Sequence, residues 1–465
     1  MTRRGACASL ALLALAATLA HAALGPRYGG TLRVGLLDLP AATAPAAPAG
    51  PGQRLVQALV HETLVGVGPE GLPTPGLARA WTSAAGGREW TLSVHERARF
   101  HDDRPVTAAD ALRSLRRFLR SPSSAAARLA QALEGGEAFR ARHSDELPGL
   151  GTLPGERVLL RLVAARALPL APLGSPAAAI TSPGGAGAGP FVPTVLVPGR
   201  RLALNAFAGH VRGRPYLDEL ELLPFADRAA LKTALQAGDL AVALGEPGIA
   251  SPTGTLLLVL DRTQAPFDRS GARAAAAAAV DRAELVRHWL PGGDASAGLL
   301  APGLLPALAS APAVAPATGR ARIALVVARD VPPAASQRVV ACLGEAGFDV
   351  RVLPDAPERA RRAASEARLL LFVPEVAETA LALHELAALV SPPPAAREAL
   401  EAAGLERDLD RRRALLLRAE AELRADLTLV PLAAAPLGAA SAPGVHDLRV
   451  DAGGRVLLES AWREP

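Results

Sequence analysis

The amino-acid sequence predicts an exported α/β protein built of two lobes. Strand-like and helix-like patterns alternate along the chain, and 465 residues are more than one ordinary domain requires. The N-terminus has the form of an export signal. Half of the residues are hydrophobic and a fifth are charged, which is typical of a globular chain rather than a disordered one.

The first residues contain the three parts of an export signal. Arg3 and Arg4 form a basic start, residues 6–19 are almost all apolar, and residues 20–22 read Ala-His-Ala, which fits the rule for cleavage between small residues. The apolar run is too short for a comfortable membrane span. We therefore expect residues 1–22 to be a signal peptide and the protein to be periplasmic. The alternative is an uncleaved membrane anchor.

Two cysteines bear on the chemistry of the exported chain. Cys7 lies at the very start of the apolar run, whereas a cysteine that carries a lipid would follow it, so lipid anchoring is not expected. Cleavage leaves Cys342 alone, which excludes an intramolecular disulfide. Cys342 lies in an apolar helical pattern, and we predict a buried core thiol rather than a nucleophile.

Charge and composition argue against a nucleic-acid partner. The formal net charge is +5, and arginine supplies nearly all of the positive charge. These arginines are spread among acidic residues, whereas nucleic-acid binders gather them in patches with aromatic residues or a known module. Aromatic residues make up only 3% of the chain, which is few for a protein that holds a ligand between stacked rings.

Alternation of apolar and polar residues predicts two early strands. In residues 31–36, Leu32, Val34 and Leu36 fall on one face, and residues 88–95 alternate in the same way. Between these strands we expect a loop at residues 40–52, a helix at 54–64 and a turn between two short extended pieces at 64–72.

The spacing of apolar residues predicts an amphipathic helix over residues 107–120. Thr107 can cap the first turn, and Asp110 can close a capping box with it. The elements that follow are expected as strands at 157–163, 201–205 and 217–223, helices at 229–237 and 271–290, a glycine-rich loop at 184–190 and a long connection at 291–319.

The C-terminal third carries the clearest topological pattern. A strand at residues 322–327, a helix at 335–346 and a strand at 348–353 predict a parallel pair joined by a right-handed crossover. The remaining expected elements are a strand at 369–373, helices at 376–389, 394–403 and 407–425, and a final strand at 428–432. Prolines at 431, 436 and 443 interrupt the last apolar run, so we do not expect it to span a membrane.

Five sequence segments occur in the order found in a known family. They are LVHETLVGVGPEGLPTPGLARAW at residues 59–81, WTLSVHERARFHDDRPVTAADALRSL at 90–115, GAGPF at 187–191, GRPYLDEL at 213–220 and RAAAAAAVDRAELV at 273–286. The chain thereby resembles the family 5 extracellular solute-binding proteins, which serve peptide and nickel ABC importers. The C-terminal part agrees with this family only in its pattern.

The resemblance implies a bilobed class II periplasmic-binding-protein-like fold. Two mixed-sheet lobes would be joined by hinge strands, with a small extra N-terminal subdomain. The expected division is a signal peptide at 1–22, lobe I at 23–48, 160–262 and 429–465, the additional subdomain at 49–159, and lobe II at 263–428.

The chain also departs from the family pattern. Asp103 stands where the family has a glycine, so a left-handed turn there would be strained. His61 replaces a tyrosine before Glu62, and Ala241 replaces an aspartate. Residues 369–374 contain neither the tryptophan nor the aspartate with which peptide-binding members meet a peptide's α-amino group.

Other kinds of site find no support in the sequence. Gly66 to Gly71 matches GxGxxG, but the prolines at 69, 73 and 75 exclude the helix that a dinucleotide site requires, so a hairpin turn is the simpler interpretation. His95 and His101 lie near Asp102, but no third histidine is close, and structural or exposed roles are favoured over a metal site. We expect no catalytic residues, no metal and no cofactor.

The favoured hypothesis is a monomeric receptor that is not an enzyme. It would close its lobes on a small molecule or short peptide and deliver this solute to ABC permease subunits. Loops at strand ends should line the cleft. The candidate ligand-binding residues are Asp38, Glu62, Gly189, Phe191 and Phe372. The alternative is a degenerate receptor fold that acts as a protein-interaction or sensory scaffold.

Overall fold

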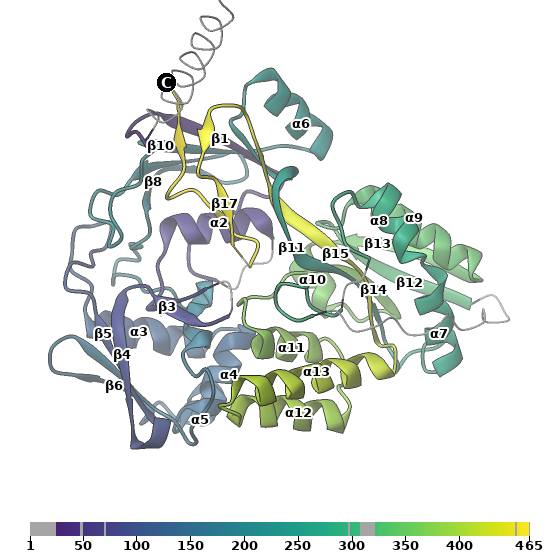
Figure 1. Cartoon of the computed structure of the whole chain (residues 1–465), viewed down its shortest axis with the longest axis horizontal. Helices are drawn as coiled ribbons and strands as arrows, with labels where there is room; N and C mark the ends of the chain where they lie inside the picture. The colour runs from purple at the N-terminus through teal and green to yellow at the C-terminus, as the bar shows by residue number, and fades with distance from the viewer. Residues whose placement is uncertain are drawn as a thin grey trace, which may run out of the picture.

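A nine-stranded sheet within the described residues joins the two halves of the molecule (Figure 1). The computed structural model describes residues 25–46, 50–68, 71–295, 298–306, 321–451 and 453–464, so the predicted signal peptide lies outside it. The strand order is β13-β12-β14-β11-β1-β10-β9-β8, and β15 pairs with β11 beside this row. The strands are β1 (Thr31–Leu36), β8 (Phe191–Val197), β9 (Arg201–Ala206), β10 (Glu219–Pro224), β11 (Val242–Leu260), β12 (Ala321–Ala328), β13 (Phe348–Asp355), β14 (Ala367–Phe372) and β15 (Leu429–Ser441).

Strand β11 passes from one half of this sheet to the other. Val242 and Ala243 pair in parallel with β1, whereas residues 255–260 pair antiparallel with β14. β15 runs antiparallel to β11 along both halves, with register shifts between the paired segments. Figure 1 shows the two strands crossing the middle of the molecule. The sequence predicted lobes joined by extended crossover segments, and β11 and β15 are these segments.

The lobe around β1 buries one face of that strand against α2 (Pro51–Val60). Leu32, Val34 and Leu36 are each at most 1% exposed, as their alternation predicted. On the same side of the molecule, α6 (Arg228–Ala237) ends at Gly238, whose φ of 82° is the left-handed conformation that glycine adopts readily.

The lobe around β12 contains the predicted crossover. β12, α9 (Pro333–Glu345) and β13 follow one another, and β12 and β13 pair in parallel. Cys342 on α9 is buried in this core, as predicted. The other helices of the lobe are α7 (Ser270–Ala279), α8 (Arg282–Trp289), α10 (Pro357–Arg362), α11 (Thr379–Ala387), α12 (Pro394–Leu405) and α13 (Leu409–Ala425).

A separate four-stranded sheet with its own core forms the subdomain. Its order is β4 (Ala78–Ala84), β5 (Glu89–Val94), β7 (Arg157–Arg161) and β6 (Leu150–Leu153). The helices α3 (Ala108–Leu119), α4 (Ser124–Ala132) and α5 (Gly136–Arg140) pack on it. The predicted capping box of α3 is confirmed, since the side chains of Thr107 and Asp110 each accept the other's backbone N–H.

Short elements complete the fold. The predicted turn after residue 64 is a hairpin of β2 (Val65–Val67) and β3 (Pro73–Pro75). Near the C-terminus β17 (Arg449–Val450) pairs with β18 (Val456–Leu457), and β16 (Val445–His446) pairs with β19 (Trp462–Arg463). Single 3-10 turns lie at η1 (Ala85–Gly87), η2 (Ala171–Gly174) and η3 (Pro176–Ala178).

Three sequence-based expectations are wrong in extent. The helix expected at 271–290 is two helices, because the side chain of Asp281 caps a new first turn at the backbone N–H of Glu284. The helix expected at 54–64 begins at Pro51, which suits a first helical position, and ends at Val60. The last strand runs on to Ser441 through Pro431 and Pro436, because the register of its pairing with β11 shifts beside both prolines.

The loop around Asp103 has the strained conformation that the missing glycine predicted. Asp103 has a φ of 62°, in the left-handed region that residues with a Cβ rarely occupy. His101 holds this loop to the glycine-rich segment, since its backbone N–H donates to the Gly187 carbonyl at 2.8 Å. Its ring Nε2 lies 3.0 Å from the Gly189 carbonyl oxygen.

The division into lobes at residues 48, 159, 262 and 428 stays a prediction. Within the described residues, no helix combines the length and apolar character that crossing a membrane requires.

Candidate functional site

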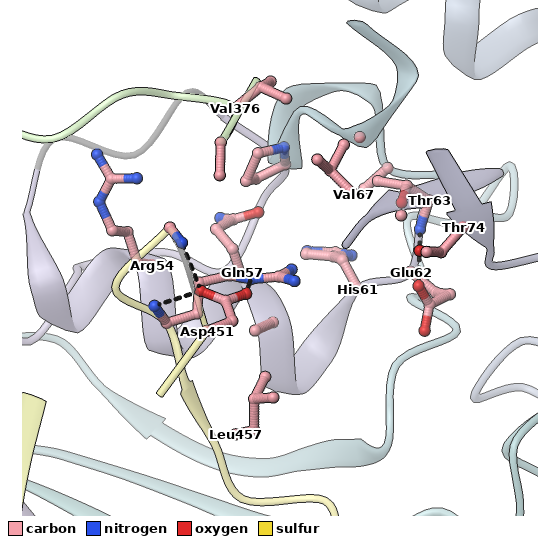
Figure 2. Close-up of a pocket in the computed structure, with 18 of the residues that line it drawn as sticks. Arg54, Gln57, His61, Glu62, Thr63, Val67, Thr74, Val376, Asp451 and Leu457 are labelled. Atoms are coloured by element: carbon pink, nitrogen blue, oxygen red, sulfur yellow. Dashed lines mark hydrogen bonds and ion pairs between the residues drawn. The ribbon is translucent and has the colours of Figure 1, made fainter. Parts of the chain in front are cut away.

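A pocket of about 490 Å³ lies beside α2, where segments far apart in the sequence meet (Figure 2). Its wall contains α2, the β2–β3 hairpin, residues 174–179, residues 375–377 and the β17–β18 hairpin. α2 packs on the core around β1, whereas residues 375–377 follow β14 in the other half of the large sheet. The pocket therefore lies between the two lobes.

Charged side chains of both signs line this pocket in equal number. The arginines are Arg54, Arg212, Arg449 and Arg455, and the carboxylates are Glu62, Glu375, Asp451 and Glu459. Four of each sign leave no formal net charge if the lining histidine, His61, is neutral. Burial lowers the pKa of His61 to about 4, which keeps its ring neutral at pH 7.

Glu62 is a buried carboxylate that depends on a cationic partner. Arg212 Nη2 lies 2.8 Å from Glu62 Oε2, and His210 Nε2 lies 3.6 Å from the same oxygen. Burial alone would raise the pKa of Glu62, but Arg212 and His210 together lower it to about 2. Glu62 is therefore ionised at neutral pH and contributes a fixed negative charge to the pocket wall.

Two polar side chains on α2 are held by the loop that follows β1. Gln57 Nε2 donates to the Ala44 carbonyl at 2.8 Å, and His61 Nε2 donates to the Thr43 carbonyl. Figure 2 shows Gln57 and His61 next to each other in the pocket wall. These bonds fix the wall that α2 contributes, so this part of the pocket is formed before any solute enters.

The β17–β18 hairpin contributes an oriented guanidinium group. Asp451 accepts bonds from the backbone N–H groups of Gly453 and Arg455, both at 2.9 Å, and from Arg455 Nε at 2.6 Å (Figure 2). The nearby Asp451 carboxylate raises the pKa of Arg455. Arg455 is thus held by its Nε atom, and its outer nitrogens make no hydrogen bond to another residue of the described ranges, so they can meet an acceptor on a solute.

Contacts across the two lobes close one end of the pocket. Arg54 on α2 donates to the carbonyls of Val373 and Pro374, both at 3.0 Å, just after β14. The next residue, Glu375, accepts bonds from Ser123 and Ser124 of the subdomain and from Ser175, which caps η3. Arg54 and Glu375 are both less than 10% exposed, so these bonds are sheltered from water.

The structure places the five predicted ligand-binding residues in different surroundings. Glu62 is in the pocket wall. Asp38 lies outside this wall and binds the start of α2, where its Oδ1 accepts the Gly52 N–H at 3.0 Å. Burial raises the pKa of Asp38 to about 6. Phe372 lies in the core around β14 and is 1% exposed.

The glycine-rich segment supports the end of α2 rather than lining the pocket. Gly189 donates its N–H to the Val60 carbonyl at 3.0 Å, and a Cβ at this position would lie 2.5 Å from the carbonyl carbon of Val60. Only glycine fits so close to another backbone. Phe191, at the start of β8, is fully buried in the core with α2. Contact of these five residues with a solute stays a prediction.

Several residues that line the pocket were not predicted from the sequence. Arg54, Glu375, Asp451 and Arg455 come from three distant parts of the chain, and no local motif links them. The one available indication was that Arg54 stands next to the apolar residues Leu55 and Val56 in the expected helix. Within the described ranges, no group of three or more His, Cys, Asp or Glu side chains could hold a metal ion.

Comparisons with known proteins agree with this architecture. Residues 73–367 match the family described as "Bacterial extracellular solute-binding proteins, family 5 Middle". No curated protein sequence matches the chain.

Solved structures with the same fold are similar over nearly the whole chain. The Escherichia coli murein tripeptide binding protein MppA is 18% identical, with a TM-score of 0.81 over 95% of this chain and 99% of that one. Haemophilus influenzae OppA in complex with RPPGFSPFR is 15% identical, with a TM-score of 0.79 over 95% and 99%. A Microbacterium hydrocarbonoxydans substrate binding protein complexed with 4-hydroxybenzoate hydrazide is 19% identical, with a TM-score of 0.76 over 93% and 100%. These likenesses confirm the predicted bilobed fold.

Proposed function

This chain belongs to the bacterial extracellular solute-binding proteins of family 5, and we propose that it captures a small solute in the pocket beside α2. It then delivers this solute to the permease of an ABC importer. The protein acts in the periplasm as a monomer after removal of residues 1–22, and it performs no chemical step on the solute.

The observation that carries this proposal is the origin of the pocket wall. Arg54 and Glu62 belong to one side of the crossing strand β11, whereas Glu375 belongs to the other. A solute in contact with both sides stabilises the closed arrangement in proportion to the contacts that it makes only there. The volume of about 490 Å³ is within the usual range of small-molecule sites.

The lining charges indicate the class of solute. Equal numbers of arginines and carboxylates favour a compact molecule that carries both charges, such as a short peptide or an amino-acid derivative. The oriented guanidinium of Arg455 suits a solute carboxylate, and the ionised Glu62 suits a cationic group. The related proteins with a murein tripeptide or a nonapeptide in their names are consistent with a peptide solute.

Calorimetric titration of the mature chain with dipeptides, tripeptides and their N-acetylated and amidated forms tests this proposal. We expect at least one zwitterionic peptide to bind, and Arg455→Met to weaken its binding at least tenfold. Arg322→Met is the matched control, because the Arg322 side chain is 92% exposed on β12. The proposal fails if no compound of this panel binds, or if Arg455→Met binds as tightly as the wild type.

A second candidate function is a non-transport scaffold that binds another protein. The bonds that Arg54 and Glu375 make across the lobes favour it, because the protein closes these contacts with its own side chains. Capture of the same protein partner from a periplasmic extract with and without the bound peptide would support the scaffold. Loss of this capture on peptide binding would support the receptor.

A further inference from the structure

We propose that the Glu375 carboxylate is a built-in latch that holds the lobes closed without a solute. It is carried by the segment that follows β14 and is bound by the subdomain. The inference concerns the chain free of solute, so it stands or falls independently of the proposed function.

Serine hydroxyls and one backbone N–H surround this carboxylate. Ser123 Oγ donates to Glu375 Oε1 at 2.5 Å, and Ser175 Oγ donates to the same oxygen. Ser124 donates to Oε2 from its backbone N–H at 3.1 Å and from its hydroxyl at 3.0 Å. Each carboxylate oxygen therefore accepts two bonds, which is nearly what water would offer it.

Ser123 and Ser175 already use their hydroxyl oxygens as hydrogen-bond acceptors, which leaves their hydroxyl protons for Glu375. Ser123 Oγ accepts the N–H of Ala126 as the cap of α4, and Ser175 Oγ accepts the N–H of Ala177 as the cap of η3. A hydroxyl has a single proton, and its oxygen is occupied by these caps, so the proton remains for an outside acceptor. The N-terminus of the nine-residue helix α4 also favours a negative charge at this position.

The segment that carries the latch is rigid at both ends. Glu375 donates its own N–H to Glu385 Oε2 at 2.9 Å, and Glu385 is paired with Arg361 at 2.7 Å. On the other side, Arg54 binds the carbonyls of Val373 and Pro374. The backbone of this segment is therefore held from both lobes, which keeps the Glu375 carboxylate beside the serines.

Apolar contacts reinforce the same closure. Val376 is 4% exposed and belongs to the core of the subdomain, although it follows β14 in the chain. Leu381 on α11 also packs against that core. Further along, Arg128 on α4 pairs with Glu401 on α12 at 3.0 Å, but this exposed pair adds little. The polar latch and Val376 thus act at one place on the interface.

A self-made latch changes how a solute is captured. In most hinge-closing receptors the solute bridges the lobes, whereas here the carboxylate already bridges them. A solute must enter during the fraction of time that the latch is open, so its apparent association is slowed by that fraction. Weakening the latch should raise the open fraction of the free protein.

Distance measurements between paired spin labels on the full mature chain, purified under denaturing conditions and refolded without solute, test the latch. Labels at Ser83→Cys on β4 and Glu398→Cys on α12 report the gap, since both positions are exposed and Cys342 is buried. We expect one short distance for the wild type. Glu375→Ala should raise the ratio of open to closed molecules by roughly 10- to 100-fold, the effect of losing a few bonds to a charged group.

Matched variants keep the outcome decisive. Glu345→Ala removes an exposed carboxylate from the same lobe and should leave the distances unchanged. Ser124→Ala with Ser175→Ala weakens the latch from the subdomain side and should open the lobes even if Glu375→Ala fails to fold. A wild-type protein that is open without solute would overturn the proposal. So would a closed distance in both Glu375→Ala and the double serine variant.

Discussion

Removal of the Arg212 guanidinium should expose the cost of burying Glu62. The Glu62 side chain is 10% exposed, and Arg212 at 2.8 Å is the cationic group that most lowers its pKa. The pKa falls from 4.5 to about 2, a difference of about 2.5 units, or about 3 kcal/mol at 1.36 kcal/mol per unit. Because the Arg212 side chain is 45% exposed, solvent screening reduces the expected effect of Arg212→Met to about 2 kcal/mol.

The pH dependence of this effect has a definite sign. A folded-state pKa below the unfolded value stabilises the protein above pH 4.5, and this stabilisation disappears as the pH falls toward 2. Arg212→Met should therefore lower the free energy of unfolding at pH 7, while the difference from the wild type should shrink at pH 3. Glu62→Gln in the same chain should restore much of the loss, because no buried charge then lacks a partner.

Urea unfolding followed by tryptophan fluorescence at pH 7 and pH 3 measures both effects. Arg322→Met is again the control, since its side chain is 92% exposed. The reasoning is refuted if Arg212→Met is as stable as the wild type at pH 7. A loss of the same size at both pH values would also refute it, because that loss would come from packing rather than charge.

Two further substitutions should stabilise the protein. Burial raises the pKa of Asp38 to about 6 from 3.8. The folded protein therefore loses stability as the pH rises through 6 and this buried carboxyl group ionises. Asp38→Asn should accordingly raise the melting temperature at pH 7.5 and change it little at pH 4; an equal gain at both values would contradict this cause. Asp103→Gly should add about 0.5–1 kcal/mol to the free energy of unfolding at any pH, because glycine adopts the φ of 62° without strain. Urea unfolding measures this gain, with Asp102→Gly as the control, because Asp102 does not have a left-handed φ. A destabilised Asp103→Gly protein would show that the contacts of the Asp103 side chain outweigh the backbone strain.

Local patterns predicted the elements that a few neighbouring residues are enough to indicate. The alternation in β1 and the capping box of α3 can each be recognised within such a short segment, and both are confirmed. β11 was missed because Gly245, Gly248 and Pro252 resemble a loop, and its pairing with β15 compensates for them from far along the chain. The long helix expected at 271–290 failed because a run of alanines carries no information about where a helix ends.

The candidate site was predictable only where a family motif marked it. Glu62 stands in such a motif and lies in the pocket wall. Arg54 and Glu375 each form hydrogen bonds to residues across the interface between the lobes. No spacing in the sequence indicates these contacts. Asp451 and Arg455 are close in sequence, but an acidic and a basic residue near each other on a loop usually form an ion pair that is exposed to solvent.

The pairing of β11 with β15 has a consequence for the order of folding. Val242 pairs with Ser441, roughly 200 residues later. The β11–β15 ladder therefore cannot form until the residues of β15 have left the ribosome. The early segments that contribute to the subdomain core have partners nearby and can collapse first. A nascent chain stalled before residue 429 should thus bury the subdomain core. Its strand β11 should still lack β15 and remain accessible to chaperones.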